Sequence, residues 1–194
     1  MPSRREILAS SAALAGAALI ASCGGGDTAT PPTETVSATQ MEDDAAVLAF
    51  LLDMEESAVV AYDYIASRLA GPALALARQF GGQERDHAAA LRRAMADLGK
   101  PADPPKAAGE YRTEFPALRS APDALAFALD LEQTAIGAYG DAFGKLFTDP
   151  LRGTLATIMA TEAEQAAAWL GRLGRPQVPD AFVTGTPPAL DEGG

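Results

Sequence analysis

Apolar residues recur at steps of three and four positions along most of this chain, which is the spacing of one face of an α-helix. The pattern divides into four long segments, which are separated by Gly, Pro and helix-capping residues. We predict helices over residues of about 43–70, 72–98, 121–147 and 150–174. Alanine is frequent and aromatic residues are few, which also favours helices over sheets. The predicted fold class is therefore all-α.

The lengths of the connections indicate how the four helices are arranged. Gly71-Pro72 and Asp149-Pro150 leave only a few residues between the members of each helix pair, whereas residues 100–119 form a long, Pro-rich segment. Short, long and short connections are typical of a four-helix bundle with one crossover, here between helices two and three. Inside the second helix, Gly81-Gly82 predicts a kink or a π-bulge, because two glycines weaken a helix.

The first 22 residues resemble a twin-arginine export signal. Arg4-Arg5 precedes a weakly apolar stretch, residues 7–20, that is too short to span a bilayer as a stable anchor. The stretch ends in Ile20-Ala21-Ser22-Cys23, which resembles a bacterial lipobox. We therefore expect an exported protein of the cell envelope, in the periplasm or at the extracytoplasmic face, anchored to a membrane by a lipid on Cys23. The alternative is a Sec signal with a chance arginine pair and an unmodified thiol.

The rest of the chain divides into a tether, a domain and a tail. Residues 23–41 are rich in Gly, Thr, Ser and Pro, and they contain too few large apolar residues to order themselves, so they are predicted to be a flexible tether. Residues 42–174 hold the four helices of the predicted bundle. Residues 175–194 are again rich in Pro and Gly and are predicted to be an irregular tail.

The second half of the predicted bundle repeats the first at an offset of 77 residues. Residues 50–55 (FLLDME) match residues 127–132 (FALDLE), and Tyr62 matches Tyr139. In the next helix of each half, Glu84 matches Glu162, and a run of alanines follows. An internal match on this scale indicates that the chain contains two similar helical hairpins.

One glutamate of each predicted helix lies on the apolar face, roughly midway along the helix. These residues are Glu55, Glu84, Glu132 and Glu162. Burial of one ionised carboxylate costs several kcal/mol, and neighbouring like charges add to that cost. The four groups must therefore take up protons, pair with arginines or bind cations. No arginine shares the middle of these faces, and two divalent ions would neutralise four carboxylates.

A glutamate on one helix and Glu-x-x-His on the next, given twice, resembles the ligand set of ferritin-like di-iron and di-manganese carboxylate proteins. The resemblance covers residues of about 43–174 and implies that Glu55 and Glu132 are terminal ligands. It also implies that Glu84 and Glu162 bridge two metal ions and that His87, the only histidine, binds the first ion. Gln165 stands where the second half should have histidine, and an amide oxygen is a poorer ligand than imidazole. The second metal position is therefore expected to be weaker, or absent.

The same resemblance implies an iron or manganese cofactor and a reaction that oxidises Fe(II) or consumes peroxide or oxygen. The alternative is a non-catalytic structural or binding bundle of the cell envelope, whose degenerate site holds protonated or solvated glutamates. Tyr62, Tyr139 and Trp169 lie on the same helix faces as the glutamates. We interpret them as core residues, although a tyrosine could also hydrogen-bond a ligand.

Charge narrows the range of partners. The formal net charge is -11, and no cluster of Lys and Arg is present, which argues against a nucleic-acid partner. An acidic surface instead raises the local concentration of cations. The single cysteine excludes an internal disulfide. The sequence does not exclude a homo-oligomer.

Overall fold

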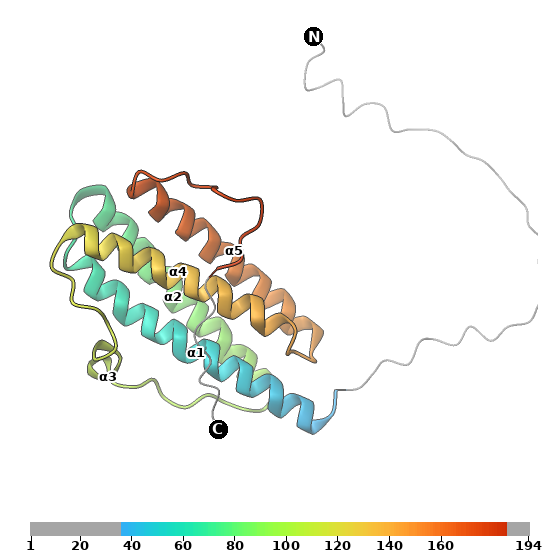
Figure 1. Ribbon diagram of the computed structural model, residues 1–194. Coiled ribbons are helices and arrows are strands. Elements are labelled where there is room, and N and C mark those ends of the chain that lie inside the picture. Colours follow the sequence, from blue (N-terminus) through green and yellow to red (C-terminus); the bar gives the residue numbers. More distant parts are fainter. Residues whose placement is uncertain (1–35, 186–194) are drawn as a thin grey trace, which may run out of the picture. The chain divides into compact units, whose positions relative to one another are not determined.

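The computed structural model describes residues 36–185, and this part of the chain is all-helical. Four long helices form a bundle, and a short fifth helix lies in the connection between its halves (Figure 1). The helices are α1 (Ala38–Ala66), α2 (Gly71–Asp97), α3 (Ala108–Arg112), α4 (Ala121–Phe143) and α5 (Asp149–Arg172). No strand occurs among the described residues, so the predicted fold class is confirmed.

The bundle consists of two hairpins that are joined by a crossover. Helix α1 packs against α2, and α4 packs against α5. Contacts of α1 with α4 and of α2 with α5 bring the two hairpins together, and α3 contacts α1. The crossover between α2 and α4 contains the short helix α3 and runs beside α1 (Figure 1). This is the short, long and short arrangement that the sequence predicts.

Helix α1 begins earlier than predicted. Ser37 accepts a hydrogen bond from the backbone N–H of Gln40, and the Gln40 side chain accepts one from the N–H of Ser37. This capping box starts the helix at Ala38, so the predicted tether of residues 23–41 is wrong in its last four positions. The rest of the predicted tether, the signal-like residues 1–22 and Cys23 lie outside the described residues.

Helix α2 is continuous α-helix through Gly81-Gly82 and has no π-helical turn there, so the predicted π-bulge is wrong. A Cβ atom on Gly81 would lie 2.9 Å from the Cβ of Tyr62 on α1, whereas a Cβ on Gly82 would meet nothing within 4 Å. Gly81 therefore allows α1 and α2 to approach each other closely beside Tyr62. Its role is in packing between helices, which a single helix does not reveal.

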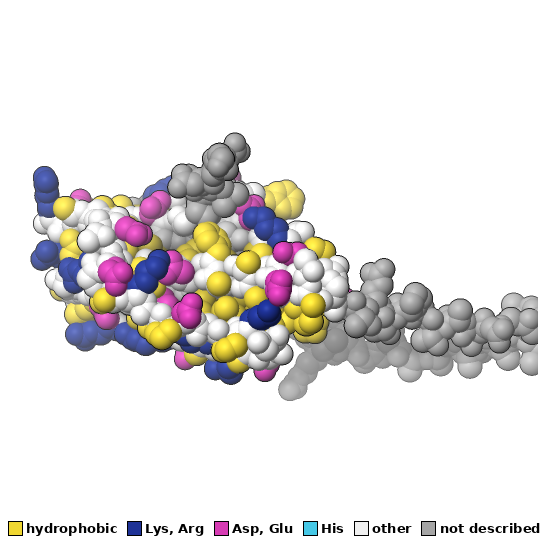
Figure 2. Space-filling model, turned by 90° about the horizontal axis from the view of Figure 1, so that it is seen from below, with side chains coloured by type: hydrophobic (Ala, Val, Ile, Leu, Met, Phe, Trp, Pro, Cys, Tyr) yellow, Lys and Arg dark blue, Asp and Glu magenta, His cyan; other side chains and the backbone are white. Residues whose placement is uncertain are grey.

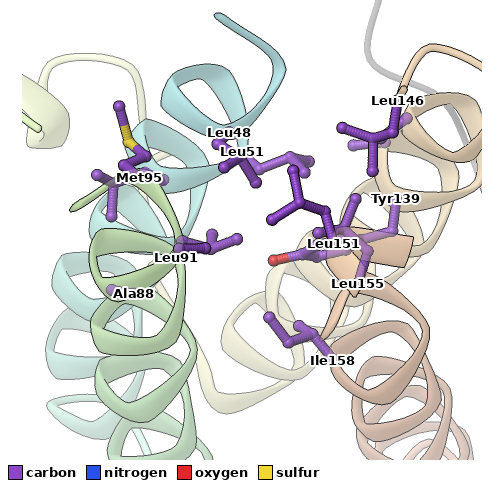
Figure 3. Packing of buried hydrophobic residues seen from close by; sticks show 14 of the residues in the cluster. Leu48, Leu51, Ala88, Leu91, Met95, Tyr139, Leu146, Leu151, Leu155 and Ile158 are labelled. Carbon is purple, nitrogen blue, oxygen red and sulfur yellow. The ribbon is translucent and has the colours of Figure 1, made fainter. Parts of the chain in front are cut away.

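Two apolar clusters occupy the two ends of the bundle interior, and the glutamates lie between them. One cluster includes Leu48, Leu91 and Leu155, whose side chains project inward from α1, α2 and α5 (Figure 3). The other cluster includes Ile65 and Trp169. Each inward glutamate falls, along its own helix, between residues of the first cluster and residues of the second. The core is thus divided by a layer of polar groups.

A buried aspartate joins the beginning of α1 to the α4–α5 loop. Asp44 is fully buried, and its carboxylate accepts hydrogen bonds from the backbone N–H groups of Phe147 at 2.8 Å and Thr148 at 2.9 Å. Bonds to a charged acceptor are stronger than those between neutral groups. Asp44 therefore fastens the second hairpin to the first at one end of the bundle.

The chain after α5 is irregular over residues 175–185 and lies on the second hairpin. Gly185 has a φ of +64° and sits against the backbone of Gln133 and Gly137 on α4. None of the helices in the described residues is long and apolar enough to cross a membrane. On the face shown in Figure 2, Lys and Arg side chains alternate with Asp and Glu.

The two adjacent glycines of α2 offer a matched pair of substitutions. We predict that Gly81→Ala lowers the free energy of unfolding by about 1–3 kcal/mol, because the new methyl group overpacks the contact with Tyr62. Gly82→Ala should raise it by about 0.5–1 kcal/mol, because alanine is the better helix former and its methyl group meets open space. Urea unfolding of both variants measures the difference. Equal stabilisation by the two substitutions would contradict the close approach.

Candidate metal centre

All four inward glutamates are buried in the middle of the bundle. Glu55 on α1, Glu84 on α2, Glu132 on α4 and Glu162 on α5 are each 1% exposed. His87, one turn after Glu84, is 8% exposed. Each residue occupies a position that the apolar periodicity of its helix turns toward the interior. The helical pattern that would normally bury leucine therefore buries carboxylates.

Four of these residues converge on one point. One ligand atom from each of Glu55, Glu84, His87 and Glu162 lies within 4.8 Å of all the others, so the group could hold a metal ion. Three carboxylates face the same ring nitrogen, His87 Nδ1. Its distances are 2.9 Å to Glu162 Oε1, 3.3 Å to Glu84 Oε2 and 3.6 Å to Glu55 Oε2. A single N–H cannot satisfy three acceptors, whereas a cation can be shared among several oxygens.

Two polar atoms around this point are buried without a hydrogen-bond partner within residues 36–185. They are the carboxylate oxygen Oε1 of Glu84 and the amide oxygen Oε1 of Gln165. A buried acceptor without a partner costs about 1–3 kcal/mol, and more when it is charged. Oxygen donors with a single imidazole are the ligand chemistry that suits iron or manganese better than copper. The residues present therefore fit such an ion.

Burial and neighbouring groups shift the pKa values of Glu55, His87, Glu132 and Glu162. Burial raises the pKa of Glu55 well above its ordinary value of 4.5, a shift that the hydrogen bond with His87 opposes and the charge of Glu162 increases. Burial likewise raises the pKa of Glu132 and of Glu162. For His87, burial alone would lower the pKa, but hydrogen bonds with Glu162, Glu55 and Glu84 raise it to about 12. Without a metal ion, the site therefore retains protons.

Each half of the bundle supplies a tyrosine to the glutamate of the other half. The hydroxyl group of Tyr139 on α4 donates to Glu55 on α1, and the hydroxyl group of Tyr62 on α1 donates to Glu132 on α4. The two contacts follow from the repeat, since each tyrosine lies two helical turns after its own glutamate on the same face. The tyrosines are thus core residues that also orient two of the carboxylates.

The two halves of the site are not equal. Trp169 Nε1 donates to the hydroxyl group of Tyr62 at 2.9 Å, whereas the repeat has Leu91 in the corresponding place. Glu132 is not one of the four convergent residues, although it lines the same cavity as Glu55, Glu84 and Glu162. The group that could hold an ion therefore contains the histidine and three of the four inward glutamates, and it does not include Glu132.

Gln165 is buried, as its place on the apolar face predicts. Its Nε2 donates to Oε1 of Gln83 on α2 at 3.1 Å, which leaves its own Oε1 without a partner in the described part of the chain. Gln83 is a residue that the sequence analysis did not single out. In the sequence, Gln83 is marked only by its position next to Glu84, and that position does not predict a contact with α5.

An all-helical bundle whose core holds carboxylates and an imidazole from different helices defines the class of four-helix carboxylate proteins. The chain belongs to the ferritin-like domain family, whose model matches residues 43–175. No curated protein matches the chain.

The fold is similar to that of a solved structure, a conserved hypothetical protein, Rv2844, from Mycobacterium tuberculosis. The TM-score is 0.60 at 19% sequence identity, and the similarity covers 68% of this chain and 97% of that chain. At this identity the likeness concerns the fold alone.

We predict that the metal-free protein becomes less stable as the pH rises above about 4.5. Between the ordinary carboxyl pKa and the raised values, the folded state binds more protons than the unfolded state. The free energy of unfolding then falls by about 1.4 kcal/mol per pH unit for each retained proton. His87 acts in the same direction above its ordinary pKa of 6.5, because its folded pKa is the higher one.

Urea unfolding in the presence of a chelator, from about pH 5 to pH 8, measures this dependence. The double variant Glu55→Gln and Glu132→Gln is the matched control, since its amides do not titrate and its curve should be flatter. A parent protein whose stability is constant over this range would show that the buried carboxylates do not titrate as inferred.

Proposed function

We propose that this protein binds a pair of iron or manganese ions in its core and uses them to oxidise Fe(II) or to consume oxygen or peroxide. The observation that carries the proposal is the convergence of Glu55, Glu84, His87 and Glu162 within 4.8 Å, with buried oxygens that have no partner within residues 36–185. Membership of the ferritin-like domain family supports it. A bound metal pair would supply the electrons for such a reaction.

In this proposal the residues have distinct roles. Glu55 and His87 would hold the first ion, and Glu84 and Glu162 would be shared between the first ion and the second. Glu132 and Gln165 complete the second position, which has no imidazole and is expected to be the weaker one. Tyr139 and Tyr62 hold the terminal carboxylates in place through their hydroxyl groups. The apolar clusters on either side of the polar layer limit the access of water.

Charge balance supports a cation rather than an arginine as the partner of the buried carboxylates. The arginines that form ion pairs within residues 36–185 are Arg85, Arg92 and Arg152, and their partners are Asp63, Glu56 and Asp149. Among the described residues, none of the four inward glutamates has an ion pair with Lys or Arg. Two divalent ions would bring four positive charges to four carboxylates.

We also propose that the protein acts outside the cytoplasm, held to a membrane by a lipid on Cys23. The support is the twin arginine at Arg4-Arg5 and the lipobox-like residues 20–23, which lie outside the described residues. Cys23→Ala should move the protein from the membrane fraction to the soluble envelope fraction. Unchanged partitioning of the variant would contradict the anchor.

The metal site is tested by thermal melts at pH 7 with and without Mn(II) or, under anaerobic conditions, Fe(II). We expect each metal to raise the melting temperature, because a ligand that binds only the folded state stabilises it, by about 2.7 kcal/mol at a hundredfold excess over Kd. Glu84→Ala should abolish the response. The control Glu164→Ala removes an exposed glutamate of α5, and we expect it to keep the rise in melting temperature on addition of metal. Absence of a metal response in the parent would favour the non-catalytic bundle.

The second metal position is tested in the same protein by its stoichiometry. Gln165→His restores the imidazole that the first half has, so we expect tighter binding of the second equivalent with little change in the first. Isothermal titration with Mn(II) measures both steps. Fe(II) oxidation and peroxide consumption by the loaded parent and variant then decide whether the site is catalytic. An unaltered second step in Gln165→His would remove Gln165 from the proposed ligands.

A further inference from the structure

A cavity of about 250 Å³ connects the buried carboxylates to the surface between α1 and α4. Its inner wall includes all four inward glutamates. Its sides carry both apolar groups and the hydroxyl groups of Ser57 and Thr134, and its outer wall includes Asp53, Tyr111 and Glu114. The volume lies below the range of about 300–1,000 Å³ of pockets that bind drug-sized molecules. The cavity therefore suits water and small ions rather than an organic substrate.

The crossover crosses α1 at the mouth of this cavity. Tyr111, which is 2% exposed, donates from its hydroxyl group to Asp53 at 3.0 Å and to Glu56 at 3.3 Å. Lys106 Nζ lies 2.8 Å from the Asp53 carboxylate. Glu56 is also paired with Arg92. The crossover is thus held to α1 by hydrogen bonds, and it carries Glu114 to a place beside Asp53 on the cavity wall.

The charges at the mouth differ from those inside. About half of the Asp53 side chain is exposed, and Glu114 is exposed, so both carboxylates are in contact with water. The Glu114 carboxylate has no hydrogen bond or ion pair within residues 36–185. At the inner end, Glu84 Oε1 is buried and lacks a hydrogen-bond partner in the described structure, and Glu162 Oε1 is buried beside His87 Nδ1. Oxygen donors therefore occur at both ends of the cavity and, as hydroxyl groups, along it.

We infer that divalent cations enter the centre through this cavity, with Asp53 and Glu114 as transit ligands at its mouth. The inference rests on the proposed function, since it requires that the inner carboxylates bind a metal. A hydrated cation that arrives at the mouth exchanges part of its water for the two exposed carboxylates. It then passes Ser57 and Thr134 and reaches the buried carboxylate oxygens of Glu84 and Glu162. Lys106 competes with the cation for Asp53, which keeps that carboxylate from retaining it.

The test is the rate at which metal-free, full-length protein binds Co(II), followed by the visible absorption of the bound ion in a stopped-flow instrument. Glu114→Gln is the cleanest variant, because it removes a charge and no hydrogen bond of the described structure. Asp53→Asn keeps an oxygen for Tyr111 and Lys106. Asp130→Asn, which removes an exposed charge on α4 away from this cavity, is the matched control. Thermal melts without metal verify that all variants are folded.

We expect both the association and the dissociation rate constants to fall by about five- to tenfold in Glu114→Gln and Asp53→Asn, with Kd unchanged. A residue that contacts the ion only on its route changes the height of the free-energy barrier between the free and the bound ion. The association and dissociation rate constants therefore change by the same factor. The control should keep both rate constants. A fall in the association rate alone, with a weaker Kd, would indicate a general electrostatic attraction and overturn the route.

The possible failures are distinguishable. Unchanged rate constants in both variants, with Co(II) binding intact, would overturn the entry route and leave the metal centre in place. No Co(II) binding by the parent protein would overturn the proposed function, and this inference with it. Glu84→Ala provides the reference for lost binding, because it removes an inner ligand and should abolish the absorption change.

Discussion

The burial of four carboxylates in the middle of a helical bundle is the constraint on which the rest of this structure depends. An apolar core would be stable with leucine at these positions, and each ionised glutamate instead carries a cost of several kcal/mol. The neighbouring structure reduces that cost in part, because His87 faces three of the carboxylates and two tyrosines donate to the terminal ones. Oε1 of Glu84 and Oε1 of Gln165 still lack a hydrogen-bond partner within residues 36–185, and such oxygens could serve as ligands of a cation.

The internal repeat explains how this arrangement arises and where it departs from symmetry. The hydroxyl groups of Tyr62 and Tyr139 each donate to the glutamate of the opposite hairpin. Side-chain hydrogen bonds therefore join the two hairpins at the polar layer. The symmetry ends at Gln165 and at Trp169, whose counterparts in the first half are a histidine and a leucine. Gln165 thus takes the place of an imidazole, whereas Trp169 adds a hydrogen bond to the hydroxyl group of Tyr62.

The helices and the inward direction of the four glutamates could be predicted from the sequence, because both depend on the apolar periodicity of single helices. A glutamate among leucines on one face must point inward whatever its neighbours are, so Glu55 and Glu132 could be placed from the sequence. The features that were missed arise between helices. The sequence of α2 alone predicts a weak point at Gly81, yet the role of this glycine depends on Tyr62 of α1. The contacts of Asp44 and Gln83 join segments that are far apart along the chain, and no local pattern marks them.

The contact made by Asp44 has a consequence for the independence of the two hairpins. The position that corresponds to Asp44 in the second half is Ala121, so only the first hairpin can hold the loop of its partner in this way. The two hairpins are therefore not interchangeable: the first supplies the buried carboxylate, and the second supplies the loop whose backbone N–H groups donate to it.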